Sequence, residues 1–118
     1  MNTLEDTNIK KTEYSGYTLL AAGATWKDKT SYSRNVQLRQ PNIFELQLDG
    51  LRIFITIGHI NYNGIWIMGC YELNIKEVEC RDCKTATQAA EYAIKSVRFK
   101  LDKMRNSLST IKNQKSND

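Results

Sequence analysis

The sequence predicts an α+β domain, in which an antiparallel β-meander of about four strands is followed by one long C-terminal helix. Between residues 43 and 75, two glycine-containing turns divide an apolar run into three strand-like segments. From residue 86 onwards, apolar residues recur at spacings of three and four, the period of a helix. The chain has 118 residues, of which 41% are hydrophobic and 25% charged, and this composition fits one domain with a single modest core.

The first part of the chain contributes less to this prediction. Residues 1–13 and 113–118 are polar and lack a period, so both are expected to be flexible tails around a single domain of residues 14–112. Residues 14–27 form an apolar strand candidate, and a polar loop follows it. Val36 and Leu38 are candidates for a short edge strand before Pro41, which cannot donate to a ladder.

Asp49-Gly50 is the sequence signature of a type I′ hairpin turn, because both of its central residues need a positive φ. A two-residue loop at this point pairs residue 48 with 51, 46 with 53 and 44 with 55. All the bulky apolar residues of the first strand then share a face with those of the second, so the turn and the pattern agree.

The second turn, at Tyr62-Asn63-Gly64, allows two registers. A two-residue Asn-Gly loop sets the apolar face opposite Glu72 and buries a carboxylate. A three-residue loop with Gly64 in the left-handed region pairs residue 55 with 71, 53 with 73 and 51 with 75. The second register is preferred because it buries no charge.

In this register the opposite face of the meander is mixed, and half of it is aromatic or aliphatic. Such a face is expected to be covered by the N-terminal strand or by another subunit. Trp66 and Met68 are therefore assigned to an oligomer interface.

Thr85-Ala-Thr-Gln88 is a capping-box pattern that predicts a helix from Ala86 to about Ile111. Such a helix is on the order of 40 Å long, and a strand of six residues spans only about 20 Å, so the sheet cannot cover all of it. Either the helix breaks near residues 105–107 and folds back, or its second half packs on another chain. We favour a homo-oligomer through the later members of a heptad seam, which are Leu101, Met104, Leu108 and Ile111.

The basic residues gather late in the chain. The formal net charge is +4, and residues 95–115 carry seven basic residues against one acid, Asp102. Arg98, Arg105 and Lys112 recur every seven residues, with Lys95 near the first of them. Either this row is a solvated helix face or it binds phosphate groups. Tyr32 and Arg34, with Trp26 just before them, supply a ring and a guanidinium for the same purpose, unless Trp26 is a core residue and Tyr32 a surface ring.

No motif predicts an enzyme or a cofactor. The chain has one histidine, no nucleophile elbow and no glycine-rich phosphate loop. Cys80 and Cys83 have CxxC spacing and, with Cys70 and His59, could supply four zinc ligands, but the usual second half of a zinc motif is missing. We therefore expect reduced thiols and no metal. No apolar run is long enough for a membrane span, and the start of the chain is acidic and polar, so we expect a cytoplasmic protein with no membrane contact.

With these residues in view, the chain resembles small proteins encoded by phages and prophages. The resemblance covers roughly residues 17–104 and is carried by Trp26, Tyr32-Ser33-Arg34, Phe44-Glu45-Leu46, Gly64-Ile65-Trp66 and Ala89-Ala90. Members of that group with an assigned role look like anti-defence factors, either anti-CRISPR inhibitors or sponges for immune signalling nucleotides, as in the anti-Thoeris proteins.

The resemblance implies a non-enzymatic function in the cytoplasm of a host cell. The preferred hypothesis is sequestration of a signalling nucleotide by a small homo-oligomer. The first alternative is an anti-CRISPR type of inhibitor that binds a host defence protein. A meander closed by a helix also resembles Whirly and PUR-type modules, so a single-stranded nucleic-acid binder is the second alternative, although the sheet is not basic.

Overall fold

The computed structural model describes residues 6–11, 16–31 and 41–115, and it confirms the α+β class. One antiparallel sheet contains seven strands that are neighbours in chain order, so the predicted number of about four was too low. A 3-10 helix, η1 (Tyr71–Leu73), connects the last two strands, and α1 (Ala86–Lys115) follows the sheet. The strands are β1 (Ile9–Lys11), β2 (Tyr17–Ala21), β3 (Ala24–Asp28), β4 (Ile43–Leu48), β5 (Leu51–Thr56), β6 (Ile67–Cys70) and β7 (Ile75–Glu79).

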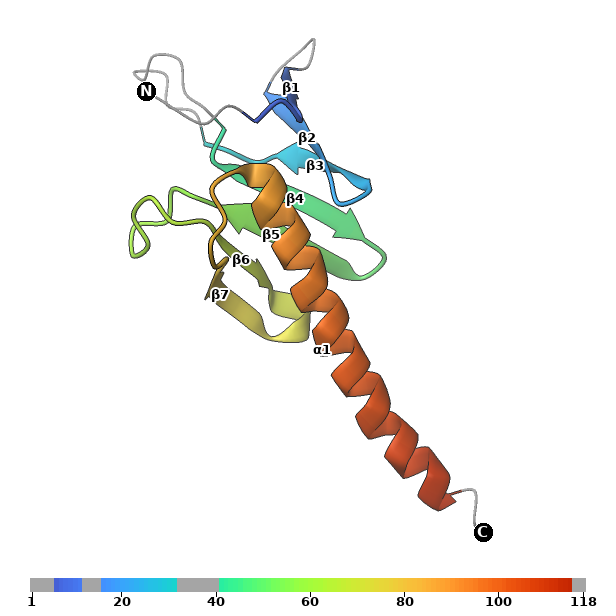
Figure 1. Ribbon diagram of the computed structural model, residues 1–118. Coiled ribbons are helices and arrows are strands. Elements are labelled where there is room, and N and C mark those ends of the chain that lie inside the picture. Colours follow the sequence, from blue (N-terminus) through green and yellow to red (C-terminus); the bar gives the residue numbers. More distant parts are fainter. Residues whose placement is uncertain (1–5, 12–15, 32–40, 116–118) are drawn as a thin grey trace.

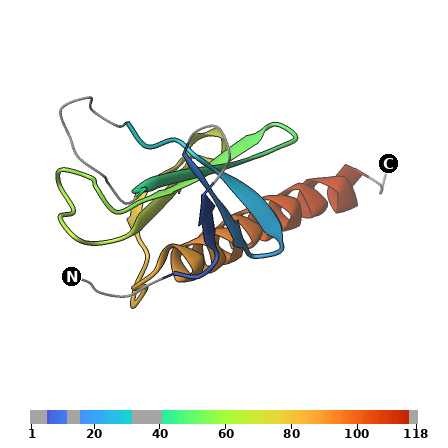
Figure 2. The same cartoon turned by 90° about the horizontal axis from the view of Figure 1, so that it is seen from above.

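The sheet and the first half of α1 form two layers, with the core between them. α1 crosses one face of the twisted sheet obliquely and continues well beyond it (Figures 1 and 2). The helix contributes small residues at this contact, which allows a close approach to the sheet. Its buried side chains lie against the apolar face of the central strands, and they are Ala86, Ala89, Ala90, Ala93 and Val97.

The expected single strand of residues 14–27 is instead a hairpin, β2–β3. Its turn is made by Ala22 and Gly23, with φ of 54° and 73°. Two successive residues with positive φ are characteristic of a type I′ turn, which matches the twist of the flanking strands. The register pairs Leu19 with Trp26, and both side chains are buried in the core.

The prediction of a tail over residues 1–13 is wrong for residues 6–11. β1 pairs with β2, with Ile9 opposite Leu19. Asp6 binds the first turn of α1 through Thr87, whose backbone N–H lies 2.8 Å from Oδ2 of the carboxylate. The N-terminal segment therefore belongs to the fold. The expected edge strand at residues 36–38 lies outside the described residues.

The first hairpin of the meander has the predicted register. Leu48 pairs with Leu51, Leu46 with Ile53 and Phe44 with Ile55. Gly50 has a φ of 79°, but Asp49 does not have a positive φ, so the register is as predicted whereas the turn is not of the predicted type I′.

The predicted register of the second turn is wrong. Ile55 pairs with Met68 and not with Tyr71, and residues 57–66 form a long connection between β5 and β6. Gly64 does have a positive φ, 75°, but it lies inside this connection. The chain reverses towards β7 at η1, where Asn74 takes the left-handed conformation with a φ of 60°.

This shift places the side chains of β6 differently from the prediction. Met68 is fully buried and belongs to the core cluster, and Trp66 is only 6% exposed within the same cluster. The assignment of Trp66 and Met68 to an oligomer interface is therefore wrong. They are core residues because, in the observed register, their side chains share the apolar face of the sheet with Ile53 and Ile55.

α1 begins as the capping pattern predicts. The Gln88 backbone N–H donates to the Thr85 hydroxyl at 3.2 Å, as expected. The Gln88 side-chain oxygen accepts the N–H of Lys84 at 2.6 Å, one residue before the N–H of Thr85 that a capping box uses. The helix then runs without a break to Lys115, and residues 105–107, where the alternative placed a break, are helical. The alternative in which the second half folds back onto the sheet is therefore wrong.

Candidate binding surface

The last part of α1 projects from the body of the protein. We call residues 98–111 the C-terminal arm. It extends beyond the sheet, past the end at which the β4–β5 turn lies (Figures 1 and 2). The molecule measures 65 Å along its longest axis but only 29 and 24 Å along the others, and the arm accounts for much of this elongation.

One apolar stripe of α1 continues from the covered half of the helix into the arm. Val97, in the covered half, is 4% exposed. The predicted interface residues of the arm are all exposed: Leu101 is 40%, Met104 49%, Leu108 65% and Ile111 60% exposed. The residues at this heptad spacing are therefore buried in the core in the first half of α1 and exposed in its second half.

Cations flank this stripe. Arg98 is exposed and Lys100 is half-buried. Lys95, one turn before Arg98, is also exposed but lies further from the stripe. Arg105 donates to Asp102 at 2.8 Å, and both side chains are largely in water, so this pair contributes little to stability. Within the described side chains, neither Lys95 nor Arg98 forms an ion pair, which leaves their charge available to an anionic partner.

The opposite side of the arm carries an aromatic residue that the sequence analysis did not single out. Phe99 is 66% exposed, and the Lys103 ammonium lies 5.5 Å from the centre of its ring. The i, i+4 spacing of the two residues was the signal that could have revealed this contact. A helical turn of about 100° per residue places Phe99 roughly opposite Leu101 and Leu108.

Of the other predicted ligand residues, only Trp26 has a described side chain. Trp26 is fully buried, and its indole N–H donates to the Ala21 carbonyl at 3.0 Å, so its ring is a core element and is not free to stack on a base. Tyr32 and Arg34 lie outside the described residues, as does the Lys112 side chain. Among the described side chains, the predicted ligand residues that share one helix are Lys95, Arg98 and Arg105.

A shallow depression of about 460 Å³ lies between the β2–β3 hairpin and the start of α1. Outside the hairpin, Asn8 and Thr87 supply uncharged polar side chains, and Glu91 supplies the only charge. A phosphate group is not suited to this site, since the one charged residue is a carboxylate. The remaining lining residues come from the hairpin and are Leu20, Ala21, Ala22, Gly23, Ala24 and Thr25.

The cysteines are thiols placed for packing. Cys70 and Cys80 are buried, and burial raises the pKa of Cys80 to about 12, with smaller contributions from Cys83 and Glu79. Cys80 and Cys83 stand at the two ends of a turn in which the Cys83 N–H donates to the Cys80 carbonyl at 3.3 Å. Among the described residues, no group of three or more His, Cys, Asp or Glu side chains is arranged to hold a metal ion. His59 instead accepts the Asn61 backbone N–H on Nδ1 at 3.0 Å.

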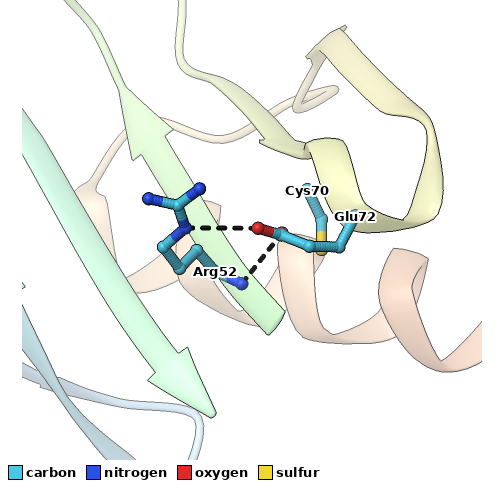
Figure 3. Close-up of polar contacts among 3 residues, drawn as sticks. All are labelled: Arg52, Cys70 and Glu72. Atoms are coloured by element: carbon cyan, nitrogen blue, oxygen red, sulfur yellow. Dashed lines mark hydrogen bonds and ion pairs between the residues drawn. The ribbon is translucent and has the colours of Figure 1, made fainter. Parts of the chain in front are cut away.

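Arg52 pairs with Glu72. The carboxylate accepts the Arg52 backbone N–H at 3.1 Å and its Nε–H at 3.2 Å (Figure 3). These bonds lower the pKa of Glu72, the backbone bond most of all. The Cys70 thiol lies 3.7 Å from the same carboxylate. This cluster ties η1 to the start of β5, which is a structural role.

Comparisons with protein-family models, with curated proteins and with solved structures give no match to this chain. None of the helices in the described residues has the length and hydropathy needed to cross a bilayer.

Proposed function

We propose that this protein is a non-catalytic binding protein that docks its C-terminal arm on a macromolecular partner. In terms of the resemblance described above, this is the behaviour of an inhibitor that binds a host defence protein. The observation that carries the proposal is the exposure of Leu101, Met104, Leu108 and Ile111 on a helix that is continuous with the core. Large side chains exposed together on one stripe are typical of an interaction surface.

The arm is suited to docking because its backbone continues from the buried first half of α1, which supplies the helical turns from which the exposed half extends. Less conformational entropy is lost when a partner covers it than if a separate segment had to form a helix on binding. A single amphipathic helix presented in this way is one of the recurring modes of protein recognition.

The test is site-specific photocrosslinking in the cells from which the protein comes. A photoreactive amino acid at position 108 should crosslink to one protein, which mass spectrometry then identifies. The same amino acid at Thr25, an exposed position on β3, is the matched control and should not crosslink to that protein. Crosslinking that Ile111→Glu does not reduce contradicts a role of the arm.

Sequestration of a signalling nucleotide is the second candidate. The specific observation that favours it is the pair of exposed cations, Lys95 and Arg98, for which the described side chains provide no carboxylate partner. The geometry supports it less than docking of the arm, because Trp26 is buried and the described depression lacks a cation. Native mass spectrometry of the protein purified from cells, followed by denaturation, tests it: a released nucleotide supports sequestration.

A further inference from the structure

The apolar stripe of the arm is exposed, and the charges beside it indicate which kind of partner covers it. With Leu101 and Leu108 at position a and Met104 and Ile111 at position d of a heptad, Arg98 and Arg105 are at position e and Lys100 is at position g. Positions e and g border the seam and select the partner of an amphipathic helix. In this arm, the e and g residues that carry charge are all cations.

A second copy of the arm is a poor fit to this border. If two arms pack in parallel, Lys100 of one lies beside Arg105 of the other. If they pack antiparallel, the e positions of the two arms, with Arg98 and Arg105, face each other. Either arrangement brings like charges together, and only two heptads of uncovered seam are available to offset the repulsion.

A membrane surface is also a poor fit. Amphipathic helices that lie in the interface place their large aromatic residues on the apolar face. In the arm, Phe99 lies on the opposite side, where the Lys103 ammonium lies 5.5 Å from the centre of its ring. The apolar stripe itself contains only aliphatic side chains and a methionine.

The arrangement fits a helix of opposite charge. Glutamates on a partner helix would pair with Arg98 and Lys100, and would compete with the exposed Asp102 for Arg105, while leucine or isoleucine residues of that helix cover the stripe. We propose that the C-terminal arm binds an acidic amphipathic helix of a different protein. This inference rests on the proposed function and names the chemistry of the partner.

The test uses two synthetic 21-residue helical peptides as probes. Both carry leucine and isoleucine at positions a and d, and they differ only at e and g, which are glutamate in one and lysine in the other. Binding of each labelled peptide to the full-length protein is measured by fluorescence anisotropy at low and high salt. We expect the acidic peptide to bind at least tenfold more tightly than the basic one and to lose affinity as salt rises.

Matched variants locate the contact. Arg98→Glu should weaken binding of the acidic peptide about tenfold, whereas Lys103→Glu, the same charge change away from the stripe, should change it less than twofold. The double variant R98E/R105E should reverse the preference and favour the basic peptide. Equal binding of the two peptides, or equal effects of Arg98→Glu and Lys103→Glu, overturns the inference.

Two further measurements separate failure of this inference from failure of the proposed function. One outcome is a dimer in sedimentation that Leu108→Glu dissociates. Another is binding of the arm to vesicles containing phosphatidylserine but not to the acidic peptide. Either outcome overturns the acidic partner, while the arm remains a binding surface. If Leu108→Glu changes neither peptide binding, vesicle binding nor sedimentation, both proposals are overturned.

Discussion

The carboxylate of Asp6 accepts the backbone N–H of Thr87 at 2.8 Å and joins the N-terminal segment to the first turn of α1, 81 residues further along the chain. The Thr87 hydroxyl donates to the same carboxylate, with Oγ1 2.7 Å from Oδ1, and accepts the Asn8 side-chain amide at 2.9 Å. A backbone N–H of the first helical turn has no partner within the helix, and a carboxylate is favoured at this end of the helix dipole. Asp6 thus caps α1 from a distance and fixes β1 against the sheet.

Replacement of Asp6 should therefore destabilise the protein although the residue lies near the chain terminus. We expect Asp6→Ala to lower the free energy of unfolding by about 1–2 kcal/mol, the cost of losing a helix cap. Chemical denaturation followed by circular dichroism measures this. Thr7→Ala, at an exposed neighbouring position, is the control and should change stability by less than about 0.5 kcal/mol. Equal stability of the two variants contradicts a capping role for Asp6.

The β2–β3 turn contains a strained residue. Ala22 has a φ of 54°, in the left-handed region, which costs an L-amino acid other than Gly, Asn or Asp about 1–2 kcal/mol. We expect Ala22→Asn, which creates the preferred Asn-Gly pair of a type I′ turn, to raise stability by about 0.5–1 kcal/mol, measured as an increase in Tm. Ala24→Asn places the same side chain in β3, next to the core, and should lower the Tm. A lower Tm for Ala22→Asn shows that strain at this turn does not limit stability.

The pH dependence of stability at the alkaline end should involve Cys80. Burial raises the pKa of this thiol from 9.0 in the unfolded chain to about 12 in the fold, so folding favours the protonated form. The resulting stabilisation is complete below pH 9 and is lost as the pH rises towards 12. We expect the free energy of unfolding of the wild type to decrease above pH 9, and that of Cys80→Ala to decrease less steeply. Tyr71, whose pKa is raised by its bond to Glu77, contributes in the same direction, so parallel curves for the two proteins would assign the loss to groups other than Cys80.

Alkylation of the native protein is a second test of the burial of Cys80. Iodoacetamide reacts with the thiolate, so Cys83, which is partly exposed, should be alkylated before Cys80, which is 2% exposed. Peptide mapping by mass spectrometry at pH 8 gives the order. Faster modification of Cys80 would contradict its burial.

The parts of the fold that were predicted correctly are those in which local chemistry and long-range pattern agree. Asp49-Gly50 combines a turn that needs positive φ with flanking residues whose apolar faces match, and its register was predicted correctly. The start of α1 was predicted for the same reason, from Thr85 and Gln88 together with the seam that follows.

The errors arose where a residue other than glycine takes a positive φ. The reversal before β7 places Asn74 in the left-handed conformation, while Gly64, on which the predicted turn was based, lies in the long connection before β6. The β2–β3 hairpin was missed because Ala22 occupies a position that normally carries Asn, Asp or Gly. For the candidate site, the seam residues of the arm were identified from spacing alone, whereas the burial of Trp26 depends on a strand pairing that spacing did not reveal.

The two halves of the apolar stripe of α1 should respond differently to the same substitution. Val97 is 4% exposed, so Val97→Ala removes packed methyl groups from the core and should cost about 1–3 kcal/mol. Leu108 is 65% exposed, so Leu108→Ala should cost less than about 0.5 kcal/mol although it removes more carbon atoms. Denaturation of both variants at two protein concentrations measures the difference. A large cost for Leu108→Ala that grows with protein concentration would mean that the arm is covered by a second copy of the chain, because only a self-associating surface links stability to concentration.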